Sequence, residues 1–198
     1  VFDVRGNPGG MYAQVYTMVD QLAPLSKAIA YSENKSGITR VLATSDEASI
    51  DLPFVVIANN TTSAAAELFA VSVRDLCGGS VVGMTTAGKG MIQSAPQRLA
   101  YGSAIVVTVA KLLTSKGESF DTVGVVPDVE VVYEIADERA LINPNFDTDQ
   151  QIVRSLDLLR SITGLSPEPA PASSSTTSAS APEAAPNDPG APSSAPAE

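Results

Sequence analysis

The side chain of this sequence best suited to acid–base chemistry is Lys89, which lies between Gly88 and Gly90 a few residues after an apolar stretch. Glycines on both sides let the backbone come close to a bound chain. A lysine enclosed by apolar walls loses hydration, which favours its neutral amine form and lets it act as a base. We therefore expect a desolvated lysine here; the alternative is an exposed lysine in a turn.

A second stretch, 63–70, is suited to present unpaired backbone donors. It follows an apolar run at 53–58 and a polar turn at 59–62, and its apolar spacing predicts the start of a helix. The first N–H groups of a helix have no partner inside it and point towards whatever binds there. Gly9 and Gly10 follow Asn-Pro and can expose further N–H groups, because no Cβ stands in the way. A tight strand-to-helix turn is the alternative reading of these glycines.

The elements around these stretches should bring them together. The run 53–58 is apolar on both faces, as expected of a central parallel strand, and 80–83 predicts the next strand. The helix expected over 64–76 lies between them, and this order gives a right-handed crossover with a parallel strand pair. Sites in such sheets lie at the C-terminal ends of the strands. We therefore expect Ala64 and Lys89 to meet in space.

The other elements follow from periodicity and turn residues. They are strands at 1–4, 29–31, 38–42, 92–99 and 103–113 and a helix at 11–22. The β-branched run 105–109 favours a place in the sheet core. Thr148 is expected to cap a last helix that ends near Gly164.

Composition narrows the chemistry. The 198 residues include no histidine, which excludes Ser-His-Asp and Cys-His catalysis and most zinc sites. The single cysteine, Cys77, excludes an internal disulfide and any Cys-rich metal site. The formal net charge is −10 and no Lys/Arg cluster exists, so we expect neither nucleic acid nor an anionic membrane as partner. No cofactor or metal is expected.

Two regions differ in composition. Residues 166–198 are almost wholly Pro, Ala, Ser and Thr, with no aromatic and no large aliphatic side chain. Such a segment cannot bury enough apolar surface to offset its ordering entropy, so we predict a disordered tail. Composition leaves open whether this tail is a wall-spanning or glycosylated stalk or has no role. Residues 1–165 suit one domain with a sizeable core.

Five pieces of the sequence resemble the C-terminal processing peptidases, S41-type serine peptidases that use a Ser/Lys dyad. They are D-x-R-x-N-x-G-G at 3–10, the stretches 63–70 and 86–93, Asp75, and the glycine-rich block at 117–128. Their order and spacing carry the resemblance, which runs from Val1 to about Val132. It implies an α/β fold, a ClpP/crotonase-like protease core with a mixed sheet and packed helices, incomplete at its N-terminus.

The nucleophile position departs from this pattern. The family places its serine three residues before a glutamate, here Glu67, and 25 residues before the lysine, and both rules give Ala64. The attacking hydroxyl is therefore absent. Ser63 is one residue early, and one residue on a helical turn rotates a side chain by about 100°, so Ser63 should point elsewhere. Either a serine was replaced by alanine, or the protein is a natural pseudopeptidase.

The resemblance also implies a role for each group. Lys89 would be the general base and Gln93 would hold it by a neutral hydrogen bond. The backbone N–H of Ala65, with one from Gly9 or Gly10, would form an oxyanion hole. Supporting roles, for which purely structural ones are the alternative, fall to Arg5, Glu67 and Asp75; the last is expected to pair with Arg5 or Arg74.

The activity implied is that of an exported bacterial endopeptidase that cuts proteins near apolar C-termini, inactive as written. Substrate would add a strand along an exposed sheet edge. The resemblance implies an upstream PDZ domain, an export signal or membrane anchor and an extracytoplasmic location, and it leaves a homo-oligomer open. The rival interpretation is a non-catalytic peptide-binding scaffold. Acyl-CoA chemistry on the related crotonase core has no supporting motif.

Overall fold

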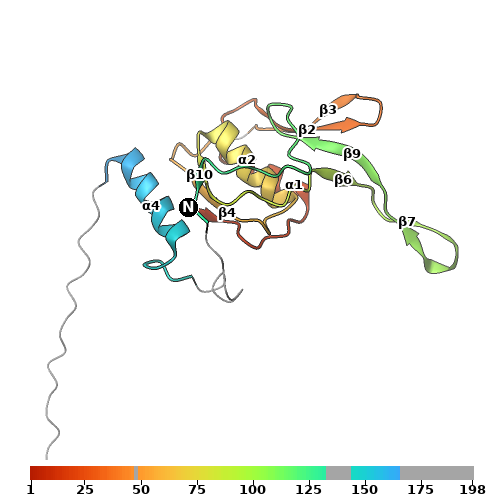
Figure 1. The fold of residues 1–198 in the computed structure, drawn as a ribbon. Coiled ribbons are helices and arrows are strands. Elements are labelled where there is room, and N and C mark those ends of the chain that lie inside the picture. The colour runs from red at the N-terminus through yellow and green to blue at the C-terminus, as the bar shows by residue number, and fades with distance from the viewer. Residues whose placement is uncertain (47–48, 133–143, 166–198) are drawn as a thin grey trace, which may run out of the picture. The chain divides into compact units, whose positions relative to one another are not determined.

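The computed structural model describes residues 1–46, 49–132 and 144–165, all within one compact unit that spans 1–166 (Figure 1). These ranges combine helices with two four-stranded sheets, so the expected α/β fold is confirmed. The tail expected at 166–198 lies outside the described residues. None of the helices in the described ranges is both long and apolar enough to cross a bilayer.

The first sheet is parallel and carries the stretches that the sequence singled out. Its strands, in spatial order, are β1 (Phe2–Asp3), β4 (Val55–Ala58), β5 (Ser80–Gly83) and β10 (Val129–Glu130). The β4–β5 pair runs in parallel from Val55 opposite Ser80 to Ala58 opposite Gly83. The predicted parallel pair with a helix between its strands is therefore confirmed, although β4 begins at Val55 and not at Pro53. Every residue of β4 is buried, as expected of a strand that is covered on both faces.

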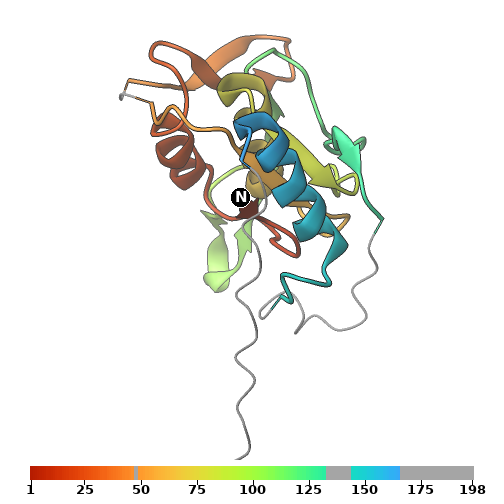
Figure 2. The same cartoon turned by 90° about the vertical axis from the view of Figure 1, so that its left-hand side faces the viewer.

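Helices cover this sheet. The described α-helices are α1 (Tyr12–Asp20), α2 (Ala65–Cys77) and α4 (Gln150–Thr163). Helix α2 packs against α1, β4 and β5, while α4, blue in Figure 2, also packs against β4 and β5. All residues from Ala65 to Val73 are buried, so α2 forms the centre of the core. Each fully buried aliphatic side chain there contributes about 1.5–3 kcal/mol.

The second sheet is antiparallel. Its strands, in spatial order, are β3 (Thr39–Thr44), β2 (Ala28–Asn34), β9 (Thr108–Leu113) and β6 (Met91–Gln93). Strand β5 of the first sheet ends at Gly83 and β6 of the second begins at Met91, so the loop that carries Lys89 joins the two sheets. We call residues 84–90 the lysine loop. Strand β6 is an edge of its sheet.

The run 105–109 does not lie in a sheet core, so that prediction is wrong. Strands β7 (Gln97–Arg98) and β8 (Ala104–Ile105) form a separate two-stranded sheet around the 3₁₀ turn η1 (Ala100–Gly102), and this hairpin extends outward in Figure 1. Exposed fractions in the run lie between 45% and 51% for Ile105, Val106, Val107 and Val109. β-branched residues favour an extended backbone, but they do not determine what covers it.

The start of the last helix also differs from expectation. Asp149, and not Thr148, is its N-cap, because the Asp149 side chain accepts hydrogen bonds from the backbone N–H groups of Gln151 and Ile152. The helix ends at Gly164 in a left-handed conformation, as predicted. Aspartate and threonine are both good N-caps, so the sequence alone does not choose between neighbours.

The exposed run 105–109 gives a prediction about stability. We expect Val107→Thr to change the free energy of unfolding by less than about 0.5 kcal/mol, because the side chain is open to water. The matched substitution Val82→Thr, at a fully buried position in β5, should cost about 1–3 kcal/mol, because it buries a hydroxyl. Urea unfolding measures both. Equal losses would show that Val107 is covered in solution.

Candidate active site

Ala64 lies at the head of α2 in a strained backbone conformation. Its φ of 54° and ψ of −114° are rare for a residue with a Cβ. The turn before it, residues 59–62, is fixed by the Asn59 side chain. This side chain accepts hydrogen bonds from the N–H groups of Thr62 in the same turn and of Gly6, just beyond β1. Strain of this kind persists only where the surrounding structure over-determines it, and it clusters at functional sites.

Ser63 is used structurally. It is buried, and its hydroxyl donates a hydrogen bond of 2.9 Å to the carbonyl oxygen of Pro8. The hydroxyl is therefore already engaged with the backbone of the neighbouring segment. It fixes the glycine loop, residues 6–10, against the start of α2.

The glycine loop lies directly against the Ala64 turn. A Cβ on Gly9 would stand 2.6 Å from the Ser63 carbonyl oxygen and 3.0 Å from the Ala64 Cβ, and the φ of Gly9 is +89°. Gly9 donates its N–H to the Asn7 side chain at 2.8 Å, so this N–H is already used. Among the described residues, the N–H groups of Gly10 and Ala65 donate no hydrogen bond to the protein. These two are the donors best suited to a developing oxyanion.

Glu67 joins the two stretches. Its side chain is completely buried on the first turn of α2. The carboxylate accepts backbone N–H groups from Ala64 at 2.7 Å, Gly88 at 2.7 Å and Lys89 at 2.8 Å. It also accepts the hydroxyl of Thr86. Buried charge is tolerated only when it is hydrogen-bonded in this way, and the N-terminal end of the helix dipole favours it further.

The lysine loop is held from a second side by a segment that the sequence analysis assigned no role. Gly90 donates its N–H to Asp121 at 2.9 Å, and Thr122 donates its N–H to the Gly88 carbonyl at 2.8 Å. Thr122 has a φ of 66°, which is strained for a β-branched residue. Backbone contacts therefore fix the positions on both sides of Lys89. Consecutive buried N–H groups need acceptors, which is the reason for this contact. The burial of these groups is known only from the structure, so the sequence alone did not indicate the partner segment.

The side chain of Lys89 is exposed, so the prediction of a lysine enclosed by apolar walls is wrong for the described chain. Gly88 and Gly90 are buried and Lys89 between them is not. The loop turns its backbone and its glycines inward, towards Glu67 and Asp121, and this leaves the side chain between them outside. Gly90 has no room for a side chain, since a Cβ there would lie 2.8 Å from the Asp121 nitrogen.

Two other predicted residues do not join this site. Gln93 is exposed on β6 and exchanges hydrogen bonds of 2.9 and 3.2 Å with Thr108, not with Lys89. Asp75 binds Lys116 at 2.9 Å and Arg74 at 3.2 Å, so the expected pair with Arg74 forms and the one with Arg5 does not. Asp75 lies eleven residues along α2 from Ala64, about 16 Å by helical rise.

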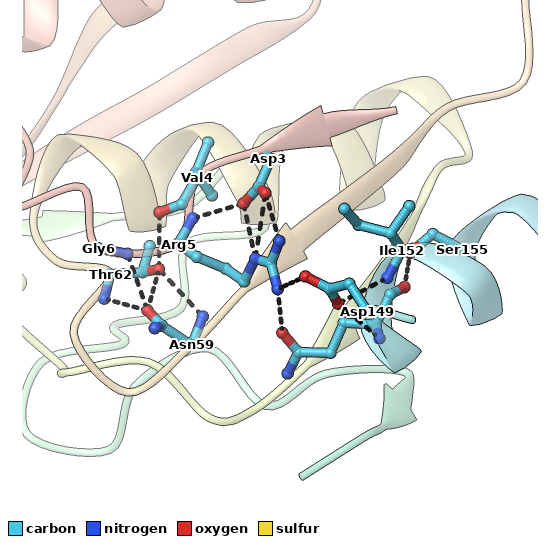
Figure 3. A network of polar contacts seen from close by, with 10 residues as sticks. Asp3, Val4, Arg5, Gly6, Asn59, Thr62, Asp149, Ile152 and Ser155 are labelled. Atoms are coloured by element: carbon cyan, nitrogen blue, oxygen red, sulfur yellow. Dashed lines mark hydrogen bonds and ion pairs between the residues drawn. The ribbon is translucent and has the colours of Figure 1, made fainter. Parts of the chain in front are cut away.

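Arg5 holds the start of the glycine loop. Its buried guanidinium binds Asp3 on β1 and Asp149 at the start of α4, each at 2.7 Å (Figure 3). Burial alone would lower the pKa of Arg5, but the hydrogen bonds and charges of Asp3 and Asp149 outweigh this and raise it. One of the two partners of Arg5 is thus 144 residues away in the sequence.

Tyr12, which the sequence analysis missed, lies within reach of the charges of Glu67 and Asp121, the two residues that hold the lysine loop. Burial raises the pKa of its phenol, and the negative charges of Glu67 and Asp121 raise it further. The group is half-buried at the start of α1. Tyr16 lies one turn further on, and burial, followed by the charge of Tyr12, raises its pKa to about 12. Both phenols are therefore neutral at physiological pH, so they add polar but uncharged groups to this region.

An apolar hollow of about 330 Å³ opens beside the free donors. Gly10 and Ala65 form part of its wall. The remaining lining comes from residues 2–18 and from the first turns of α2. Its polar members are Asp3, Asn7 and Gln14, and its large apolar members are Phe2, Val4, Met11, Val15, Met18 and Phe69. A hollow of this kind next to unpaired N–H groups suits a peptide whose carbonyl meets the donors while a neighbouring apolar side chain fills the space.

The family model for peptidase family S41 matches residues 1–131, which include every site residue discussed above except Asp149. The chain belongs to peptidase family S41. The S41 chain is 35% identical to the carboxy-terminal processing protease CtpA of Bacillus subtilis over 150 residues, 76% of this chain and 31% of that protein. It is 33% identical to a carboxyl-terminal-processing protease of Synechocystis over 159 residues, 80% of this chain and 36% of that protein.

Solved structures share this fold. The photosystem II D1 C-terminal processing protease superimposes with a TM-score of 0.55 at 30% identity, over 66% of this chain and 33% of that one. A lipoprotein from Streptococcus agalactiae shares the fold with a TM-score of 0.59 at 17% identity, over 81% and 53% of the two chains. The S41 chain spans about a third of the length of the Bacillus and Synechocystis proteases.

The Glu67 carboxylate should dominate the stability of the site. We expect Glu67→Gln to lower the free energy of unfolding by about 3 kcal/mol, because the new amide NH₂ faces N–H donors and two charge-assisted hydrogen bonds are lost. The control Glu130→Gln, at an exposed position on β10, should change it by less than about 0.5 kcal/mol. Urea unfolding measures the free energy of unfolding of both variants. A small loss in both would contradict the dominant role of the Glu67 carboxylate.

The two glycines should respond differently to alanine. Gly9→Ala is expected to cost more than about 2 kcal/mol, because a positive φ and contact with the Ser63 carbonyl both oppose a Cβ. Gly10→Ala, which meets nothing within 4 Å, should be neutral or stabilise by up to about 1 kcal/mol. Thermal unfolding compares the pair, and equal behaviour would mean that the glycine loop does not lie against the Ala64 turn.

Proposed function

We propose that this S41 chain binds a peptide across the Ala64 turn and, with a serine at position 64, hydrolyses it by a Ser/Lys mechanism. The observation that supports this most is one shared atom. Oε2 of Glu67 accepts the backbone N–H groups of both Ala64 and Lys89. The side chains at these two positions therefore start from neighbouring backbone sites, although they are 25 residues apart in the sequence.

The proposed chemistry follows from these positions. A serine hydroxyl at 64 attacks the peptide carbonyl carbon, and the neutral Lys89 amine takes its proton. The oxyanion is stabilised by the N–H groups of Gly10 and Ala65, typically worth a few kcal/mol each. Lys89 then returns the proton to the leaving amine, and water hydrolyses the ester that remains at position 64. As written, Ala64 has no hydroxyl, so the first bond cannot form.

A bound peptide would also provide the shielding from water that the exposed Lys89 side chain lacks. Strand β6 is a sheet edge and begins two residues after Lys89, so a substrate strand that pairs with it would lie over the lysine. Removal of water from Lys89 by the substrate would favour the neutral amine that the mechanism needs. The apolar hollow next to Gly10 and Ala65 would receive an apolar side chain of the same peptide.

The relatives guide the substrate class. Proteins named carboxy-terminal processing proteases support protein C-termini as substrates of the whole protein. An extracytoplasmic location, with an upstream PDZ domain and an export signal or anchor, remains our expectation from the family resemblance, as does a homo-oligomer as an open alternative. Gln93 and Asp75 are proposed to act on the fold around the site and not on the substrate.

Peptide binding without cleavage is the second function, and two observations favour it. Position 64 carries a methyl group, and the only candidate base in the described site is exposed. A scaffold of this type needs the hollow and the β6 edge but no nucleophile. It also needs no strain at Ala64, which instead favours a site built for chemistry.

Restoring the hydroxyl separates the two functions. We expect Ala64→Ser, made in the full-length protein, to hydrolyse an unfolded protein substrate with an apolar C-terminus that the parent leaves intact. Lys89→Ala in that background should lower kcat at least about 100-fold, because the general base is lost. Lys111→Ala, an exposed lysine on β9, is the matched control and should retain activity. Turnover is followed by mass spectrometry of the products.

Two results would contradict the peptidase proposal. One is a folded Ala64→Ser variant that binds the substrate without cleaving it, which assigns the scaffold function. The other is cleavage that survives Lys89→Ala undiminished, which would show that a different group removes the proton.

A further inference from the structure

The Arg5 guanidinium binds partners on two elements, Asp3 on β1 and Asp149 at the start of α4. Its Nε and Nη2 atoms face Asp3 and donate to both carboxylate oxygens, at 3.0 Å and 2.7 Å (Figure 3). Its Nη1 atom faces the other way and donates to Asp149 at 2.7 Å and to the Gln151 amide oxygen at 3.1 Å. The Arg5 side chain is completely buried, so water does not replace a lost partner without a rearrangement.

Asp149 has two simultaneous functions at the start of α4. Oδ1 caps the helix by accepting the N–H groups of Gln151 at 3.0 Å and Ile152 at 3.2 Å. Oδ2 binds Arg5. The Gln151 side chain continues the connection, because its Nε2 donates to the Val131 carbonyl at 2.7 Å, just beyond β10. The first turn of α4 is therefore linked to β1 on one side and to the end of β10 on the other.

Arg5 is also the residue directly before the glycine loop. Gly6 donates to Asn59, and Asn7 accepts the N–H of Ser63 at its carbonyl and that of Gly9 at its side chain. A displacement of Arg5 would therefore shift the glycine loop, which is hydrogen-bonded to the turn next to Ala64. The partners of the glycine loop itself, Asn59 and Ser63, belong to the neighbouring turn, while Asp149, which binds Arg5, belongs to a helix from the other end of the described chain.

We propose that Asp149 and Gln151 are positioning residues for the glycine loop. They act through Arg5 and touch neither the substrate nor the Ala64 turn. This inference rests on the proposed function only where it says that the loop supplies an oxyanion donor. The consequence is that a helix outside the matched family range determines the geometry of the site. Undocking the first turn of α4 would loosen the donor at Gly10 and leave the core sheet in place.

Asp149→Asn tests this in the chain as it stands. Asparagine still caps a helix, so α4 should persist, but the charged partner of Arg5 is lost. We expect amide hydrogen exchange at Gly6, Asn7 and Gly9, whose N–H groups are the hydrogen-bonded ones of the glycine loop, to become at least about tenfold faster, with exchange in β4 and β5 unchanged. Asp157→Asn is the matched control, because Asp157 lies on the same helix and its ion pair within the described ranges is with the exposed Arg160. It should leave residues 6–10 as they are.

Asp149→Ser is the second variant, since serine also caps the helix but is too short to reach Arg5. The inference is overturned if residues 6–10 exchange as in the parent in whichever variant folds. An equal acceleration throughout the chain overturns it as well, because that would show a purely global role in stability.

Activity provides a separate measurement. In an active Ala64→Ser background, Asp149→Asn should lower kcat at least about tenfold with KM nearly unchanged, because an oxyanion donor acts in the transition state. A rise in KM alone would contradict positioning of the donor. If Ala64→Ser itself shows no turnover, the proposed function fails, and the exchange measurement still decides whether α4 holds the loop.

Discussion

A buried carboxylate surrounded by donors is the constraint on which this site depends. Glu67 has no exposed surface, and its two oxygens accept four hydrogen bonds from the head of α2 and from the lysine loop. A buried charge without such partners would cost several kcal/mol, so the head of α2 and the lysine loop must both come to it. The parallel sheet brings them to the same edge, and the carboxylate sets their distance.

The same constraint explains why the lysine loop places its side chain outside. Three consecutive N–H groups, from Gly88 to Gly90, turn inward to Glu67 and Asp121, and Thr122 fixes the Gly88 carbonyl. Once the backbone is held in this manner, the Lys89 side chain can only leave on the open face. Its desolvation must then come from whatever binds there, which ties base chemistry to substrate binding in the proposed mechanism.

Much of the frame could be predicted from the sequence because it follows from local patterns. The apolar run at β4, the helix after it and the crossover to β5 are properties of neighbouring residues, and α2 differs from its predicted bounds by one residue at each end. Position 64 was located by the resemblance to the family, whose spacing to Glu67 and Lys89 gives Ala64. These features need no knowledge of distant contacts.

The remaining features depend on contacts that no local pattern encodes. The partner of Arg5 lies 144 residues away in a segment outside the family match, and the Asp121 carboxylate reaches Gly90 across 31 residues. The run 105–109 has the composition of a core strand, but its aliphatic side chains are 45–51% exposed. Burial, including that of Lys89, is a property of the assembled neighbours and not of a residue's own sequence context.

The closeness of position 64 to the Lys89 amine is the central claim, and the titration of a thiol placed there tests it most directly. In a Cys77→Ser background, Ala64→Cys introduces one thiol whose ionisation can be followed by ultraviolet absorbance. The account predicts a pKa about one unit or more below the ordinary value near 8.5, and a return towards that value when Lys89→Met is added. An identical pKa with and without the lysine would show that its charge does not reach position 64 and would contradict the account.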